Sequence, residues 1–187
     1  MHEDTFWELV DEAREEAGND EERFLEVLER GLMELPPNAI EGFRERLDDV
    51  LARAYRWDLW AAAYIINGGA SDDGFQYFRA WLISRGQRVF EQALKDPAGL
   101  ETFVPNDPAW LAEFEEMLYL PVYALEQKTG EEVPLPEPLE TTEEEEIEIE
   151  IAAPAGEPWD EATVDELFPG LARQAKARFS QSRGNEA

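Results

Sequence analysis

The chain has 187 residues, enough for one domain of ordinary size with its own core. Its 44 acidic and 16 basic residues give a formal net charge of -28, which argues against nucleic-acid binding because affinity for the phosphate backbone depends on Lys and Arg. Cys is absent and the one histidine is His2, so disulfides, zinc ribbons and a histidine-based triad within the chain are excluded. Neither a long apolar run nor a secretory signal is present, so we expect a cytoplasmic protein with no membrane partner.

Residues 1–130 carry apolar side chains at three- and four-residue spacing, which predicts an all-α fold, a compact multi-helix bundle. Cap and stop signals place six helices: after Asp4, after Asn19 or Asp20, after Asn38, from Trp57 to Asn67, from Ser71 to about Leu94, and from about Pro108 to Lys128. The helix from Trp57 to Asn67 is apolar on nearly all sides and is expected to be the central buried helix. Gly68 and Gly69 provide its stop.

The composition changes after residue 130. Residues 131–156 are rich in Pro and Glu and are interpreted as a solvated acidic linker. Residues 157–187 form a C-terminal amphipathic tail with short helices. Within the linker, isoleucines alternate with glutamates in the pattern of a short strand, and bulky apolar residues follow in the tail. The partner-binding candidates are therefore Ile147, Ile149, Ile151, Trp159, Leu167 and Phe168.

One segment concentrates rare residues: LWAAAYIINGGASDDGFQYFRAWLISRGQRVFEQALKDP. Its order of glycines, an SDD triplet, FRxWLI and a further glycine resembles the signature of the bacterial domain-of-unknown-function family numbered 4240. The resemblance extends to FWELVDEAR near the start and EFEEMLYLPVYALEQKTG near residue 130. It implies a helical bacterial domain but brings no activity, catalytic residue or cofactor with it.

The chemistry of this segment has two interpretations. In the first, Ser71 and Asp72 cap a helix, Asp73 pairs with Arg79 or Arg56, and the tryptophans and tyrosines are core residues. In the second, the polar residues and the ring-bearing face line a ligand or oxygen-ligated metal site. The ligand-binding candidates are Trp60, Tyr64, Asn67, Ser71, Asp72, Asp73 and Arg79.

Two functions remain open. The first is a non-catalytic, acidic interaction or regulatory module that binds a protein partner, particularly a basic one. The alternative is an enzyme or small-ligand binder centred on the segment from Asn67 to Arg79. We favour the first, because the missing Cys and the terminal position of His2 narrow the catalytic mechanisms open to the chain. No cofactor and no specific metal site are identified.

Overall fold

The computed structural model describes residues 1–134 and 153–182. Within them the chain is all-α, as predicted, with one isolated β-bridge between Arg56 and Ala155. None of the helices in these two ranges is long and apolar enough to span a membrane. The elements are α1 (Glu3–Ala17), α2 (Glu21–Glu34), α3 (Pro37–Arg53), α4 (Trp57–Asn67), α5 (Asp72–Ser84), α6 (Gln87–Lys95), the 3-10 helix η1 (Pro97–Phe103), α7 (Glu116–Thr129), α8 (Val164–Leu167) and α9 (Pro169–Ser182).

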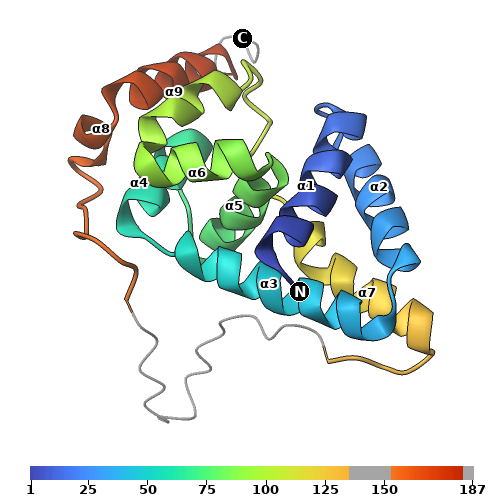
Figure 1. Cartoon of the computed structure of the whole chain (residues 1–187). Helices are drawn as coiled ribbons and strands as arrows, with labels where there is room; N and C mark the ends of the chain where they lie inside the picture. The colour runs from blue at the N-terminus through green and yellow to red at the C-terminus, as the bar shows by residue number, and fades with distance from the viewer. Residues whose placement is uncertain (135–152, 183–187) are drawn as a thin grey trace.

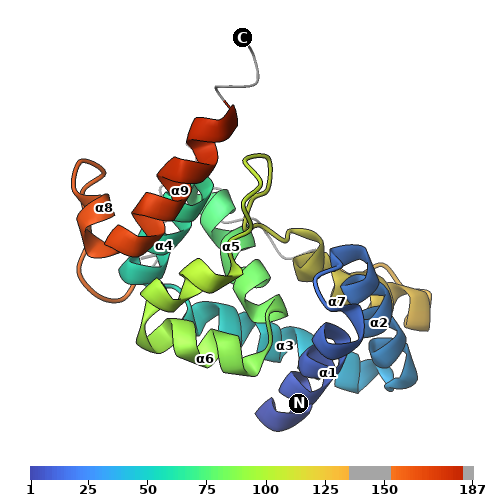
Figure 2. The same ribbon diagram turned by 90° about the horizontal axis from the view of Figure 1, so that it is seen from above.

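The helices form two groups on either side of α5 (Figure 1). On one side α1, α2 and α7 pack together, and α3 runs beneath them. On the other side α4 packs against α8 and α9, and α9 lies across α4 when the molecule is seen from above (Figure 2). The signature segment forms α4, α5 and α6 and therefore occupies the middle of the fold.

The core is built from the apolar faces that the sequence predicts. Leu59 and three consecutive alanines of α4 are inaccessible to solvent, which confirms α4 as a central buried helix. Phe78 and Trp81 of α5 are also fully buried, with their ring centroids 5.5 Å apart. Burying each of these large side chains contributes roughly 1.5–3 kcal/mol.

Two helix starts differ from the expectation. The first helix is capped by His2, whose Nδ1 accepts the backbone N–H of Asp4, and not by Asp4 itself. The third begins at Pro37, with Pro36 in the cap position and no side-chain cap, where Asn38 was expected. Proline suits a first helical turn because its missing N–H would have no partner there. Asp20 caps α2, one of the two residues predicted for that position.

The helix predicted from Ser71 to about Leu94 is two helices. Its N-cap is confirmed, because the Ser71 hydroxyl accepts the N–H of Gly74 at 3.1 Å. The break falls at Gly86, whose φ of 91° lies in a region that side chains rarely adopt. The Asp11 carboxylate then accepts the N–H of Gln87 at 2.8 Å and provides a cap from another element. The apolar spacing continues through this break, so the spacing alone does not reveal it.

The last predicted helix of the domain starts eight residues later than expected, at Glu116 instead of Pro108. Two backbone N–H groups in the intervening stretch donate to partners outside it: Ala112 to the side-chain oxygen of Asn67 at 2.9 Å, and Phe114 to the carbonyl of Tyr77 at 3.1 Å. These tertiary bonds replace the bonds of a helix. Gly130 ends α7 in a left-handed conformation, as the sequence predicts.

The C-terminal segment packs on the helical domain. Leu171 and Ala175 of α9 are buried, and the guanidinium of Arg178, fully inaccessible, donates to the carbonyl of Ile66 at the end of α4. Ahead of α8, Ala155 exchanges backbone hydrogen bonds with Tyr55 and Trp57, both of 2.9 Å. Part of the predicted linker and tail therefore contributes to the same core as α4.

Candidate functional site

The predicted ring-bearing face of α4 is covered by other parts of the chain. Trp60 stacks on Phe75 with ring centroids 4.9 Å apart, and its indole N–H donates to the carbonyl of Ala70 at 3.1 Å. Tyr64 faces the ring of Trp159 at 5.1 Å, and a hydrogen bond to Glu161 raises the pKa of its hydroxyl. Both side chains join α4 to its neighbours, so they do not form an open pocket together.

Asn67 also has a structural role. Its side-chain oxygen accepts the N–H of Ala112, and its amide nitrogen donates to the Glu113 carboxylate at 3.4 Å. It thereby ties the end of α4 to the irregular segment before α7. Metal coordination finds no support here, since within residues 1–134 and 153–182 no three His, Cys, Asp or Glu side chains gather closely enough to hold an ion.

Arg79 is buried without the carboxylate partner that the sequence predicts. Its Nη1 donates to the Leu51 carbonyl at 3.0 Å, and its guanidinium lies 5.0 Å from the ring centroid of Tyr55. Burial lowers its pKa to about 10. The expected ion pair with Asp72 or Asp73 is wrong among the described residues, because both aspartates are exposed in the first turn of α5. Arg56, the other predicted partner, pairs with Asp58 at 2.6 Å.

Next to Asp73, tyrosines and carboxylates form an exposed surface. The hydroxyl groups of Tyr77 and Tyr119 both donate to Glu115, at 3.1 and 3.5 Å. Tyr123 lies one turn further along α7, is 53% exposed, and has its ring centroid 6.4 Å from that of Tyr119. Burial and Glu115 raise the pKa values of both hydrogen-bonded tyrosines, and the charge of Asp73 adds a smaller contribution in the same direction. We call Asp73, Tyr77, Glu115, Tyr119 and Tyr123 the tyrosine face.

We expect Tyr77 to titrate well above an ordinary tyrosine. Burial and the hydrogen bond to Glu115 raise its pKa from 10.0 to about 12. Between these values the folded chain holds a proton that the unfolded chain has lost, so this group makes stability fall as the pH rises through that window. Ultraviolet difference titration of the protein against its Tyr77→Phe variant measures the pKa. Glu115→Gln should move it down, whereas Glu116→Gln, the neighbouring exposed residue, should not; equal effects would contradict the arrangement.

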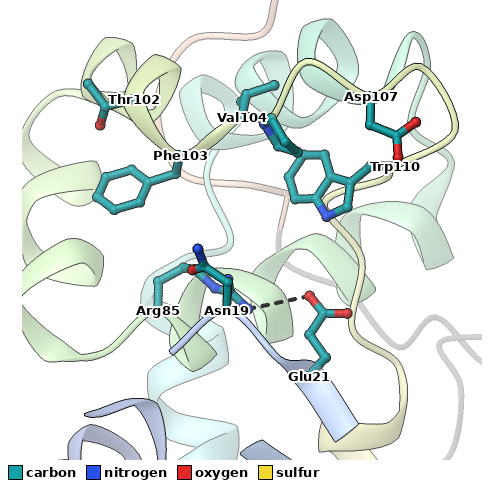
Figure 3. Close-up of a pocket in the computed structure, with 9 residues that line it drawn as sticks. Asn19, Glu21, Arg85, Thr102, Phe103, Val104, Asp107 and Trp110 are labelled. Carbon is teal, nitrogen blue, oxygen red and sulfur yellow. Dashed lines mark hydrogen bonds and ion pairs between the residues drawn. The ribbon is translucent and has the colours of Figure 1, made fainter. Parts of the chain in front are cut away.

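A second feature, which the sequence did not predict, is a pocket of about 540 Å³ where the start of α2 meets the end of α5 and the segment from η1 to Trp110 (Figure 3). Its walls include none of the seven predicted ligand-binding residues. Apolar side chains face charged ones across it. The side chains that matter for its chemistry are Glu21, Arg85, Phe103, Val104, Asp107 and Trp110.

Arg85 forms the charged floor of this pocket. Its side chain is 9% exposed and makes one ion pair of 3.4 Å with Glu21. The guanidinium stacks over Trp81 at 5.3 Å and also donates to the Ser84 hydroxyl. Arg14 donates to the carbonyl of the same serine, so two guanidinium groups meet beside one carboxylate. Burial and the neighbouring Arg14 lower the pKa of Arg85 to about 10.

The sequence predicts only one of the contacts that build this pocket. Arg85 lies four residues after Trp81 inside the signature segment, and that spacing predicts the stack. Phe103 and Val104 lie outside the predicted helices, Trp110 lies near the start of a stretch predicted to be helical, and Glu21 comes from the other end of the domain. Nothing in their spacing brings them together.

Comparison with known protein families matches residues 1–127 to the family described as "Protein of unknown function (DUF4240)". No curated protein and no solved structure matches the chain significantly. The matched range runs from the start of α1 into α7 and includes the whole signature segment. The resemblance inferred from that segment is thereby confirmed, and the chain belongs to the DUF4240 family.

Proposed function

We propose that this protein is a non-catalytic interaction module that binds a basic protein partner through the tyrosine face, in a bacterial cell as the family resemblance implies. The observation that carries the proposal is the exposed ring of Tyr123, which lies beside the half-buried Tyr119 and near the exposed carboxylates of Glu115 and Asp73. Aromatic rings next to carboxylates suit Lys and Arg side chains, which gain both an ion pair and a cation–π contact.

The charge of the whole chain supports a basic partner. At a net charge of -28, the field of the protein attracts cationic surfaces and speeds their encounter, and it repels nucleic acid. The charge alone cannot select one surface, because acidic residues are spread over many helices. The tyrosine face adds to its carboxylates the exposed ring of Tyr123 and the half-buried ring of Tyr119, which can anchor a docked side chain.

Two of the tail residues considered as partner anchors are already packed within the chain. Trp159 and Phe168 are partly buried against the core of the same chain, and Leu167 is 51% exposed. Ile147, Ile149 and Ile151 lie outside the described residues. We therefore place the partner on the tyrosine face.

The test compares two crosslinkers and two charge-matched variants. A photoreactive phenylalanine replaces Tyr123 in one sample and Glu45, an exposed acid on α3, in the other. The protein captured at position 123 is then purified, and its affinity is measured for the Glu115→Gln and Glu45→Gln variants.

Each variant removes one negative charge, so a non-specific charge effect weakens both equally. We expect Glu115→Gln to lower the affinity by about tenfold and Glu45→Gln by much less, because only the first removes a contact. The loss of affinity caused by Glu115→Gln should be smaller at high salt. Equal effects of the two variants, or a partner without a basic surface, would contradict the proposal.

A further inference from the structure

We infer that the pocket between Arg85 and Trp110 binds a free α-amino acid with an aromatic side chain: Arg85 takes the carboxylate, Glu21 takes the ammonium group, and the ring lies between Phe103 and Trp110. This site lies apart from the tyrosine face and does not depend on the proposed function. It uses a buried guanidinium whose contacts within the chain are incomplete.

Two guanidinium groups meet at the floor of the pocket. Arg14 and Arg85 meet at Ser84, and the only carboxylate paired with either of them in the described part of the chain is Glu21, at 3.4 Å from Arg85. That distance is long for a charge-assisted hydrogen bond, which is normally about 2.7–2.9 Å. Among the described residues, the bonds of Arg85 use Nε and Nη2 only, which leaves Nη1 for a further acceptor. A ligand carboxylate would accept a hydrogen bond from this nitrogen.

An ammonium group beside that carboxylate fits Glu21. The Glu21 carboxylate lines the pocket, is 37% exposed, and in the described part of the chain has one ion pair, the long one of 3.4 Å with Arg85. Arg85 and Glu21 are adjacent, as are the carboxylate and ammonium groups of an α-amino acid. The ligand would thus replace one long ion pair by two closer ones.

The walls above the ion pair suit a flat ring. Figure 3 shows Phe103 and Trp110 on the side of the pocket opposite Arg85, with Val104 between them. Phe103 is 37% exposed, so its ring has apolar surface to cover, whereas Trp110 is held from behind by Trp81, at 5.7 Å between ring centroids. The volume of about 540 Å³ lies within the range of roughly 300–1,000 Å³ typical of small-molecule sites.

Asp107 restricts the choice of ligand further. It lines the same pocket at the rim, across from Arg85 (Figure 3). A second carboxylate on the far end of the ligand would meet this negative charge. Dicarboxylates should therefore bind poorly, and a neutral ring is preferred.

Calorimetric titration of the full chain with three compounds that share a phenyl ring tests the assignment. L-phenylalanine carries both charges, 3-phenylpropionate only the carboxylate, and phenethylamine only the ammonium group. We expect L-phenylalanine to bind at least about tenfold more tightly than either analogue, because each loses one charged contact.

Variants locate the site. Glu21→Gln should remove the advantage of L-phenylalanine over 3-phenylpropionate, and Phe103→Ala should weaken both, while Glu22→Gln, a neighbouring exposed acid, should change neither. Circular dichroism confirms that each variant is folded. The assignment is overturned if L-phenylalanine does not bind, if either single-charge analogue binds as tightly, or if Glu22→Gln acts like Glu21→Gln.

Discussion

Replacing Trp81 by alanine is expected to lower the free energy of unfolding by about 3–5 kcal/mol, the range for removing a buried tryptophan. Trp81 is fully buried in α5 and packs against Phe78 on one side and Trp110 on the other. The cavity left by the indole could not close easily, because the guanidinium of Arg85 rests on the same ring. Urea denaturation followed by circular dichroism at equilibrium measures the loss.

Trp60→Ala is the matched control, since Trp60 is a tryptophan of the same segment that is only partly buried. The Trp60→Ala variant loses the stack on Phe75 and the hydrogen bond to Ala70. We expect its free energy of unfolding to fall by less than that of Trp81→Ala. Trp81→Phe should recover much of the stability, because the ring is retained and the indole N–H, which has no hydrogen-bond partner in the described structure, is removed. If Trp60→Ala were the more damaging change, the centre of the fold would lie on α4 and not on α5.

The sequence was informative at the two ends of the signature segment's first loop, where the controlling interaction is local. The limits of α4 follow from its apolar composition and from Gly68, which adopts the left-handed conformation that a helix end requires, with φ of 75°. The start of α5 follows from Ser71, whose hydroxyl reaches a backbone N–H three residues away. Such features depend on a few consecutive residues.

The sequence was uninformative where a group is satisfied from a distant element. A buried arginine normally needs a carboxylate, so Arg79 predicted an ion pair, but the last turn of α3 supplies the Leu51 carbonyl instead. The sequence before α7 predicts a helix, yet Asn67 and Tyr77 accept hydrogen bonds from two of the backbone N–H groups in that stretch. The spacing of apolar residues cannot identify either acceptor, because each lies on a helix more than 35 residues away from its donor.

The candidate sites illustrate the same limit. The signature segment drew the prediction of a site because it combines rare residues, but Trp60, Tyr64 and Asn67 serve contacts between α4 and its neighbours. Two other residues of the segment take part in the candidate surfaces. Asp73 reaches the tyrosine face, and Arg85 reaches the pocket, each together with residues from segments that were not singled out.

Deleting residues 131–187 is expected to leave a folded domain of lower stability. The apolar stripes of α1 to α7 close before Gly130, so the shortened chain should keep a cooperative unfolding transition. It loses the burial of Leu171 and Ala175 and exposes the rings of Trp57 and Tyr64, so we expect its free energy of unfolding to fall by on the order of 2–5 kcal/mol. Scanning calorimetry of the full and shortened chains measures the difference.

The deletion changes the net charge of the chain as well as the packing of the tail. Single substitutions in the full chain test the effect of packing on stability alone. Trp159→Ala removes a ring packed on α4 and should lower the unfolding temperature, whereas Leu167→Ala, a change at a residue that is 51% exposed, should leave it nearly unchanged. If the shortened chain lost its cooperative transition, α9 would be an obligatory part of the core. If Trp159→Ala had no effect on stability, the contact with Tyr64 would contribute little to folding. Trp159 would then be free to serve a partner, as the sequence first suggested, because moving its ring away from α4 would cost the domain little.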